Sequence, residues 1–92
     1  MDKSINNKQW CVYVLKCRDN SLYIGLTNNI DKRLKEHDRG TGSKFVRSKR
    51  PFELLKTIPC NDAKQARSLE YSLKKLKRSE KIKALSLETE TA

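Results

Sequence analysis

Two short runs of strand-forming residues, separated by a turn, constrain the fold more than any other feature of the sequence. The first run, Trp10 to Cys17, is rich in β-branched and aromatic residues, and the second run, Leu22 to Leu26, has the same character. Residues 18–21 between them, Arg-Asp-Asn-Ser, have the composition of a turn. We therefore predict an antiparallel hairpin in which Tyr13 and Tyr23 lie near each other.

A helix that carries further polar groups is predicted after the second strand. Gly25 interrupts that strand, which is typical of a bend or of a close backbone approach. An amphipathic pattern then runs from about Asn29 to Arg39 and stops at Gly40. Arg33 and His37 lie beside its apolar stripe, one turn apart. The residues expected to face water are Lys32, Lys35, Glu36 and Arg39.

The second half of the chain predicts one more strand and two more helices. Pro51 opens a strand that runs from Phe52 to Ile58. Asp62 caps the next helix, and Gln65 three residues later completes a capping box. Ser79 is expected to cap a short third helix.

The length of 92 residues allows one domain with a small core. The predicted elements occupy residues 10–85 in the order β-β-α-β-α-α, an α/β (α+β) domain with helices on at least one face of its sheet. Residues 1–9 are expected to form a disordered tail, and residues 86–92 a frayed one. Because so small a core leaves no room for a large cavity, a polymer lying across the surface fits better than an engulfed metabolite.

The charge of the chain favours a polyanionic partner. Lys and Arg number 21 against 11 acidic residues, a net charge of +10. Such an excess binds nucleic acid through the release of counterions from the phosphates. A membrane surface is less favoured, because no long amphipathic helix combines a basic face with Trp or Phe. No signal peptide and no apolar run near the ~20 residues of a membrane span is present, so we expect a cytoplasmic protein.

The three cysteines are interpreted as buried free thiols. Cys11, Cys17 and Cys60 are odd in number, widely spaced and set in apolar runs. They form no Cys-x-x-Cys pair, and the single histidine does not complete a zinc site of normal spacing.

Five residues are candidates for chemistry, and each also has a purely structural explanation. They are Tyr13, Tyr23, Arg33, His37 and Glu70. Tyrosine is a common packing residue in strands, a helix arginine is usually a solvated charge, and a lone histidine is often incidental. An ion pair with Lys74 explains Glu70, yet a carboxylate at the rim of an apolar stripe can also hold a divalent cation. Together these residue types suit phosphodiester cleavage, which needs a base, a cation for the developing charge and a metal as Lewis acid.

The spacing of these residues resembles that of a GIY-YIG nuclease domain. More narrowly, the chain is similar to the small stand-alone bacterial proteins of that superfamily, of the Slx1-like or UPF0213 type. Tyr13 stands where the tyrosine of the first motif belongs, and Tyr23-Ile24-Gly25 is the second motif verbatim. Arg33, eight residues after that motif, matches the family's helix arginine. His37 matches a position often held by His or Tyr, and Glu70 matches the metal-binding glutamate.

The resemblance covers residues 11 to about 85 and implies the GIY-YIG fold, a three-stranded antiparallel sheet flanked by three helices. It also implies hydrolysis of DNA with a single Mg²⁺ or Mn²⁺ held by Glu70. Arg33 would stabilise the pentavalent transition state, and His37 would assist by hydrogen bonding or proton transfer. One of the two tyrosines would activate water, and which of them does so stays open. Gly25 would let the backbone approach the site closely.

The chain also departs from the family pattern. Cys11-Val12 replaces the Gly-Ile of the first motif, and no asparagine follows Asn61, although some members carry one after the second helix. Larger relatives take their target choice from attached DNA-binding modules. The resemblance therefore implies structure-directed cleavage linked to DNA repair or recombination, with a protein partner that supplies target specificity. A monomer is favoured over a homo-oligomer.

Three functional hypotheses follow. The first is a metal-dependent endonuclease, the second a non-catalytic nucleic-acid-binding module on the same fold, and the third an accessory protein that contacts another protein. The dense positive charge supports the second, with Phe45 and Phe52 as stacking groups. The first is favoured, because binding alone needs no carboxylate amid so much positive charge. The residues expected to contact phosphates are Arg39, Lys44, Arg47, Lys49, Lys74, Lys75, Lys77 and Arg78.

Overall fold

The computed structural model describes residues 9–87, and seven helices and strands follow one another in this range. They are β1 (Cys11–Cys17), β2 (Leu22–Thr27), α1 (Ile30–Arg39), α2 (Lys44–Ser48), β3 (Phe52–Pro59), α3 (Ala63–Lys74) and α4 (Arg78–Ala84). Residues 1–8 and 88–92 of the two predicted tails lie outside the described range. None of the helices within it is both long and apolar enough to cross a membrane.

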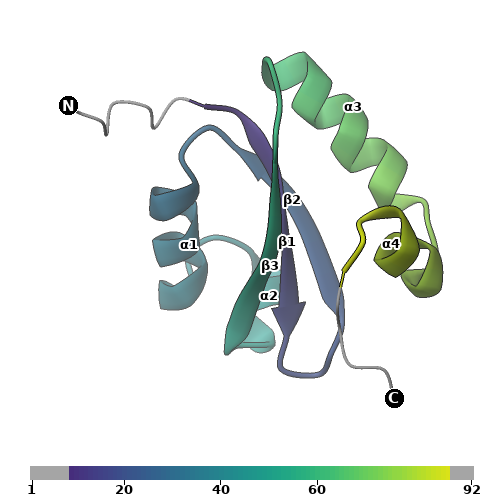
Figure 1. The fold of residues 1–92 in the computed structure, drawn as a ribbon. Helices are drawn as coiled ribbons and strands as arrows, with labels where there is room; N and C mark the ends of the chain where they lie inside the picture. Colours follow the sequence, from purple (N-terminus) through teal and green to yellow (C-terminus); the bar gives the residue numbers. More distant parts are fainter. Residues whose placement is uncertain (1–8, 88–92) are drawn as a thin grey trace.

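The three strands form one antiparallel sheet in the order β2-β1-β3, with β1 in the centre (Figure 1). The predicted hairpin is present, and its register sets Tyr13 opposite Gly25. β3 pairs with the other side of β1, and an irregularity between Val14 and Leu15 shifts the register there. The prediction of a three-stranded antiparallel sheet is confirmed.

Helices cover both faces of this sheet, so the central strand is buried on both sides (Figure 1). Val12 and Val14 point to one face, where they belong to a cluster with Leu73 of α3. Tyr13 points to the other face, where it packs with Val46 of α2 and with residues of α1. We call these the α3 face and the α1 face. The alternation of side chains along a strand accounts for the division.

The three cysteines are buried and free, as predicted. Burial raises the pKa of the Cys11 and Cys17 thiols above the usual value of 9.0. These two groups therefore stay protonated at neutral pH and pack as small apolar side chains.

Helix α2 is the main departure from the predicted order, which placed three helices where the described residues form four. The Ser43 hydroxyl accepts a hydrogen bond from the Val46 N–H at 3.3 Å, which caps the helix. Val46 is fully buried and fixes the helix against the α1 face. A five-residue helix is too short to show a helical period in the sequence, and the glycines at 40 and 42 favour a loop.

The prediction that Ser79 caps the last helix is wrong. α4 begins at Arg78, so Ser79 lies inside it and Lys77 is the N-cap residue. The Glu80 carboxylate accepts a hydrogen bond from the Lys77 N–H at 2.8 Å and satisfies that donor in place of a serine hydroxyl. At α3 the predicted cap is present, because Asp62 accepts a hydrogen bond from the next turn of the helix.

Candidate active site

Four of the five candidate residues meet on the α1 face. Tyr13 comes from β1, Tyr23 from β2, and Arg33 and His37 from α1. The centroids of the two tyrosine rings are 6.2 Å apart. The His37 ring lies 5.7 Å from the ring of Tyr13 and 5.4 Å from that of Tyr23, edge-on to both. The hairpin and the first helix are sufficient to bring this cluster together.

The Tyr13 hydroxyl lies at the centre of the cluster. Its oxygen is 2.7 Å from Nε2 of His37 and accepts a hydrogen bond from Nε of Arg33 at 3.4 Å. Burial raises the pKa of Tyr13 well above the usual value of 10.0, although Arg33 acts in the opposite direction. The phenol therefore keeps its proton at neutral pH. Because a buried O–H group needs an acceptor, we infer that it donates to His37.

His37 is fully buried, whereas the helical pattern placed it beside the apolar stripe. Both tyrosine rings and Phe52 of β3 surround its imidazole, and the sequence of one helix does not show this. Burial lowers the pKa of His37 from 6.5, and the charge of Arg33 lowers it further, so the ring is neutral at neutral pH. With Nε2 as acceptor, the proton resides on Nδ1. Nδ1 has no hydrogen-bond partner among the described residues, which costs on the order of 1–3 kcal/mol.

The Arg33 guanidinium is held on three sides. Besides its bond to Tyr13, it donates to the Glu36 carboxylate at 3.0 Å and to the Gly42 carbonyl at 3.3 Å. Its side chain is 31% exposed, so the group touches both the buried phenol and solvent. It also borders a surface cavity of about 250 Å³ that Trp10 helps to line. Arg33 is therefore the charged member of the cluster that a ligand can reach.

Two further residues belong to this site, and the sequence pattern did not predict either of them. Glu36 was expected to face water, but it forms the ion pair with Arg33. The three-residue spacing of the two on one helix was the available signal. Gly42 has no such signal, since its place over His37 depends on the path of the loop. A β-carbon at Gly42 would lie 2.8 Å from Nδ1 of His37. The close backbone approach expected at Gly25 is also present, and there the neighbour is the Tyr13 ring.

Glu70 belongs to α3, which packs on the face of the sheet opposite the cluster. Its carboxylate is 3.1 Å from Nζ of Lys74, which is the ion pair considered as its structural explanation. Within residues 9–87, no hydrogen bond or ion pair joins Glu70 to the other four candidates. Nor does any group of three or more His, Cys, Asp and Glu side chains in this range form a metal site. A metal at Glu70 stays a prediction.

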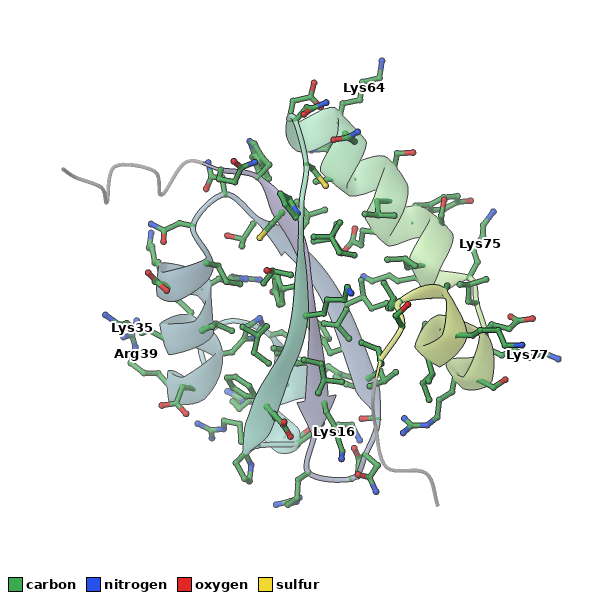
Figure 2. The ribbon with its side chains drawn as sticks, in the orientation of Figure 1. Lys16, Lys35, Arg39, Lys64, Lys75 and Lys77 are labelled. Carbon is green, nitrogen blue, oxygen red and sulfur yellow. The ribbon has the colours of Figure 1, made fainter. Side chains whose placement is uncertain are left out.

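The basic residues expected to contact phosphates lie on both sides of the molecule. Figure 2 shows Lys35 and Arg39 extending from α1, and Lys75 and Lys77 extending from the side of α3 and α4. Lys75 lies 4.3 Å from the ring centroid of Tyr71, and Arg78 donates to the carbonyl of Asn20 in the hairpin turn. The predicted residues divide into Arg39, Lys44, Arg47 and Lys49 on the side of α1 and α2, and Lys74, Lys75, Lys77 and Arg78 on the side of α3 and α4.

Known proteins with similar sequences identify the relatives of this chain. Residues 9–83 match the family described as the GIY-YIG catalytic domain. A UPF0213 protein of Clostridium perfringens is 44% identical over 75 residues, which cover 82% of this chain and 81% of that protein. A UPF0213 protein of Oceanobacillus iheyensis is 42% identical over 82 residues, which cover 89% of this chain and 95% of that protein.

Two solved structures have the same fold. The solution NMR structure of a UPF0213 protein from Bacillus halodurans matches with a TM-score of 0.57 and 37% identity, over 85% of this chain and 83% of that one. The NMR structure of a protein from E. faecalis matches with a TM-score of 0.60 and 33% identity, over 95% and 96% of the two chains. The chain therefore belongs to the GIY-YIG catalytic-domain family, a family of nucleases, and UPF0213 proteins are among its relatives.

Proposed function

We propose that this chain is a metal-dependent endonuclease that hydrolyses phosphodiester bonds in DNA. The observation that carries the proposal is the Tyr13 hydroxyl, held between Arg33 and His37 inside an apolar core. A tyrosine with only a packing role does not need a buried imidazole and a guanidinium beside its hydroxyl, and burying such groups costs stability. Membership of the GIY-YIG family supports the same class of reaction.

The two tyrosines suit different roles. Tyr13 is fully buried and keeps its proton, so it is poorly suited to accept one from water. Tyr23 is only partly buried and is the tyrosine that solvent reaches. We therefore propose that Oη of Tyr23, as the phenolate formed when its own proton is released to solvent, accepts the proton of the attacking water, and we assign to Tyr13 the positioning of Arg33 and His37.

Arg33 is assigned to the phosphate. Burial lowers the pKa of its guanidinium, but the hydrogen bonds to Tyr13 and Glu36 outweigh this and raise the pKa above its usual value. The group is therefore always charged, and its planar donors suit phosphate oxygens. It would stabilise the negative charge that develops during displacement. The neutral His37 adds no charge and acts through its hydrogen bond to Tyr13.

Glu70 is the residue proposed to hold a single Mg²⁺ or Mn²⁺. One carboxylate suits Mg²⁺, which keeps several waters and takes phosphate oxygens as further ligands. The side chain of Glu70 is 20% exposed, and its partner Lys74 is 53% exposed, so a cation can replace the ammonium without opening the core. Glu70 would therefore supply a single protein ligand to such a cation. When bound, the cation supplies Lewis-acid activation of the phosphate.

Cleavage of supercoiled plasmid and of a branched synthetic DNA, in Mg²⁺, Mn²⁺ or EDTA, tests the proposal. Glu70→Gln should abolish metal-dependent cutting while DNA binding is kept. Glu53→Gln is the matched control, because it removes the same charge from an exposed position on β3 and should cut normally. Equal cutting by both variants would remove Glu70 from the site.

A non-catalytic nucleic-acid-binding module is the second candidate. The observation that favours it is that Glu70 belongs to α3, whereas Tyr13 and Arg33 meet on the opposite face of the sheet. A binding module predicts salt-sensitive DNA binding with no cutting in any metal. The Glu70→Gln variant would then bind like the unchanged protein.

We further propose that cleavage is directed by DNA structure and serves DNA repair or recombination. Basic side chains on both sides of the molecule support contact with more than one DNA segment, as at a branch (Figure 2). Faster cutting of a branched substrate than of a linear duplex with the same sequence tests this.

We also propose that the protein is a monomer that takes its target specificity from a protein partner. Sedimentation of the purified protein tests whether it is a monomer.

A further inference from the structure

Helix α2 holds one aromatic side chain at a fixed place beside the candidate site. Val46 anchors the helix in the core, and the Lys49 carbonyl accepts a hydrogen bond from the Arg18 N–H at 3.0 Å in the hairpin turn. The middle of the helix and its C-terminal end are therefore attached to the rest of the fold. Phe45 directly precedes the buried Val46, so its position is set by the fold.

Phe45 combines exposure with contact to a candidate catalytic residue. It is 42% exposed, which is unusual for a phenylalanine next to a buried cluster. Its ring stacks on Tyr23, with centroids 5.8 Å apart and planes 27° apart. Nζ of Lys49 lies 5.1 Å from its centroid and pairs with the Asp19 carboxylate at 2.6 Å. An exposed ring and a lysine thus lie directly beside the proposed base.

We propose that an unpaired nucleobase of DNA stacks on Phe45, so that the phosphate of the same nucleotide contacts Lys49 and the adjoining backbone passes Tyr23. This inference rests on the proposed function only in taking DNA as the partner. It specifies the substrate as single-stranded or frayed DNA, because bases inside a duplex present no free face to a side chain. When DNA binds, the Lys49 ammonium leaves the Phe45 ring and contacts the phosphate. In the free protein, the ion pair with Asp19 holds Lys49 beside the ring.

The chain offers a matched control for this proposal. Tyr71 is 64% exposed on α3 and also has a lysine ammonium over its ring, that of Lys75 at 4.3 Å. It differs from Phe45 in lying on the opposite side of the sheet from Tyr23. If any exposed aromatic beside a lysine bound DNA, the two residues would behave alike.

Binding measured in EDTA separates stacking from cutting. The probe is a short single strand that contains 2-aminopurine, whose fluorescence is quenched on stacking, compared with the same sequence as a blunt duplex. Phe45→Leu should weaken binding of the single strand about tenfold and remove the quenching. Its duplex affinity and its salt dependence should be unchanged, because no charge is removed. Tyr71→Leu should behave like the unchanged protein.

Phe45→Trp completes the test, because it keeps an aromatic face and should restore both affinity and quenching even if leucine disturbs α2. Unchanged binding of the single strand by Phe45→Leu would overturn the proposal, as would an equal loss for the duplex or for Tyr71→Leu. Quenching that depends on Phe45 without plasmid cutting would overturn only the nuclease assignment. Cutting that depends on Glu70 without an effect of Phe45→Leu would overturn only the stacking.

Discussion

The α-carbon of Gly25 lies against the ring of Tyr13, its partner across the β1–β2 pairing. A β-carbon at Gly25 would lie 2.5 Å from both Cζ and Oη of Tyr13, a separation that carbon atoms do not tolerate. The glycine of the Tyr-Ile-Gly motif is therefore required by the tyrosine of the other strand. The absence of a side chain at Gly25 gives the Tyr13 hydroxyl the space in which it meets His37.

Gly25→Ala should accordingly displace the Tyr13 ring and lengthen its bond to His37. Overpacking of this kind costs about 1–3 kcal/mol of unfolding free energy. Metal-dependent cutting should fall with it, because Arg33 loses the partner that orients it. Thermal unfolding and plasmid cleavage measure the two effects. A variant with unchanged stability and unchanged cutting would contradict this account of the glycine.

The two tyrosines should respond differently to loss of the hydroxyl. Tyr13→Phe leaves Nε2 of His37 and Nε of Arg33 without their shared partner, so the unfolding free energy should fall by about 1–3 kcal/mol. Tyr23→Phe should change stability by less than about 0.5 kcal/mol, because this ring keeps its packing. It should nevertheless abolish cutting, since Tyr23 is the proposed base. If the Tyr23→Phe variant still cuts DNA, another group must act as the base.

Much of this arrangement could be predicted from the sequence, because it depends on local pattern. Two strand-forming runs joined by a turn specify the hairpin, and Arg33 and His37 follow one turn apart on the next helix. These segments suffice to bring both tyrosines, the arginine and the histidine together. Alternation along β1 also separates the two faces of the core.

The remaining features depend on contacts between segments that are distant in the sequence. His37 is buried because Phe52 of β3 closes over it, and the sequence of α1 alone does not show this. Phe45 reaches Tyr23 only because α2 forms, and that helix is too short to produce a periodic pattern. The place of Glu70 relative to Arg33 depends on how α3 packs on the sheet, which no motif encodes.

The stability of the protein should depend on pH through its single histidine. The pKa of His37 is lower in the folded state than its unfolded value of 6.5, so the unfolded chain binds the proton more tightly. Unfolding free energy should therefore fall as the pH drops below about 6.5, by up to about 1.4 kcal/mol per pH unit, until the folded-state pKa is passed. Thermal unfolding at a series of pH values measures this.

His37→Gln is the control for this dependence, because its amide can still accept a hydrogen bond from Tyr13 but does not titrate. The carboxyl groups of Asp19 and Glu36 have lowered pKa values, so their contributions are lost only below about 3.8 and 4.5. Between about pH 4.5 and 6.5 the variant should show little change in stability. The same slope in both proteins would mean that another group titrates.

Lys75 should contribute to DNA binding as a single phosphate contact. Lys75→Ala should reduce the slope of log affinity against log salt by about 0.9 or less, uniformly across DNA sequences. Lys75→Arg keeps the charge and should keep the slope. An unchanged slope in the alanine variant would place this part of α3 outside the DNA footprint.

Two glycines of one loop separate the role of His37 from the stability of the loop. A β-carbon at Gly42 would press within 2.8 Å of Nδ1 of His37, and the Gly42 carbonyl also holds Arg33. Gly42→Ala should therefore lower the unfolding free energy by about 1–3 kcal/mol and also reduce cutting, because both contacts belong to the proposed site. Gly40 has a φ of +87° but lies beside the flexible side chain of Arg47, so Gly40→Ala should cost about 1 kcal/mol of stability and leave cutting nearly unchanged. If Gly40→Ala and Gly42→Ala lose the same fraction of cutting activity under conditions of equal stability, the loop acts only as a structural connection.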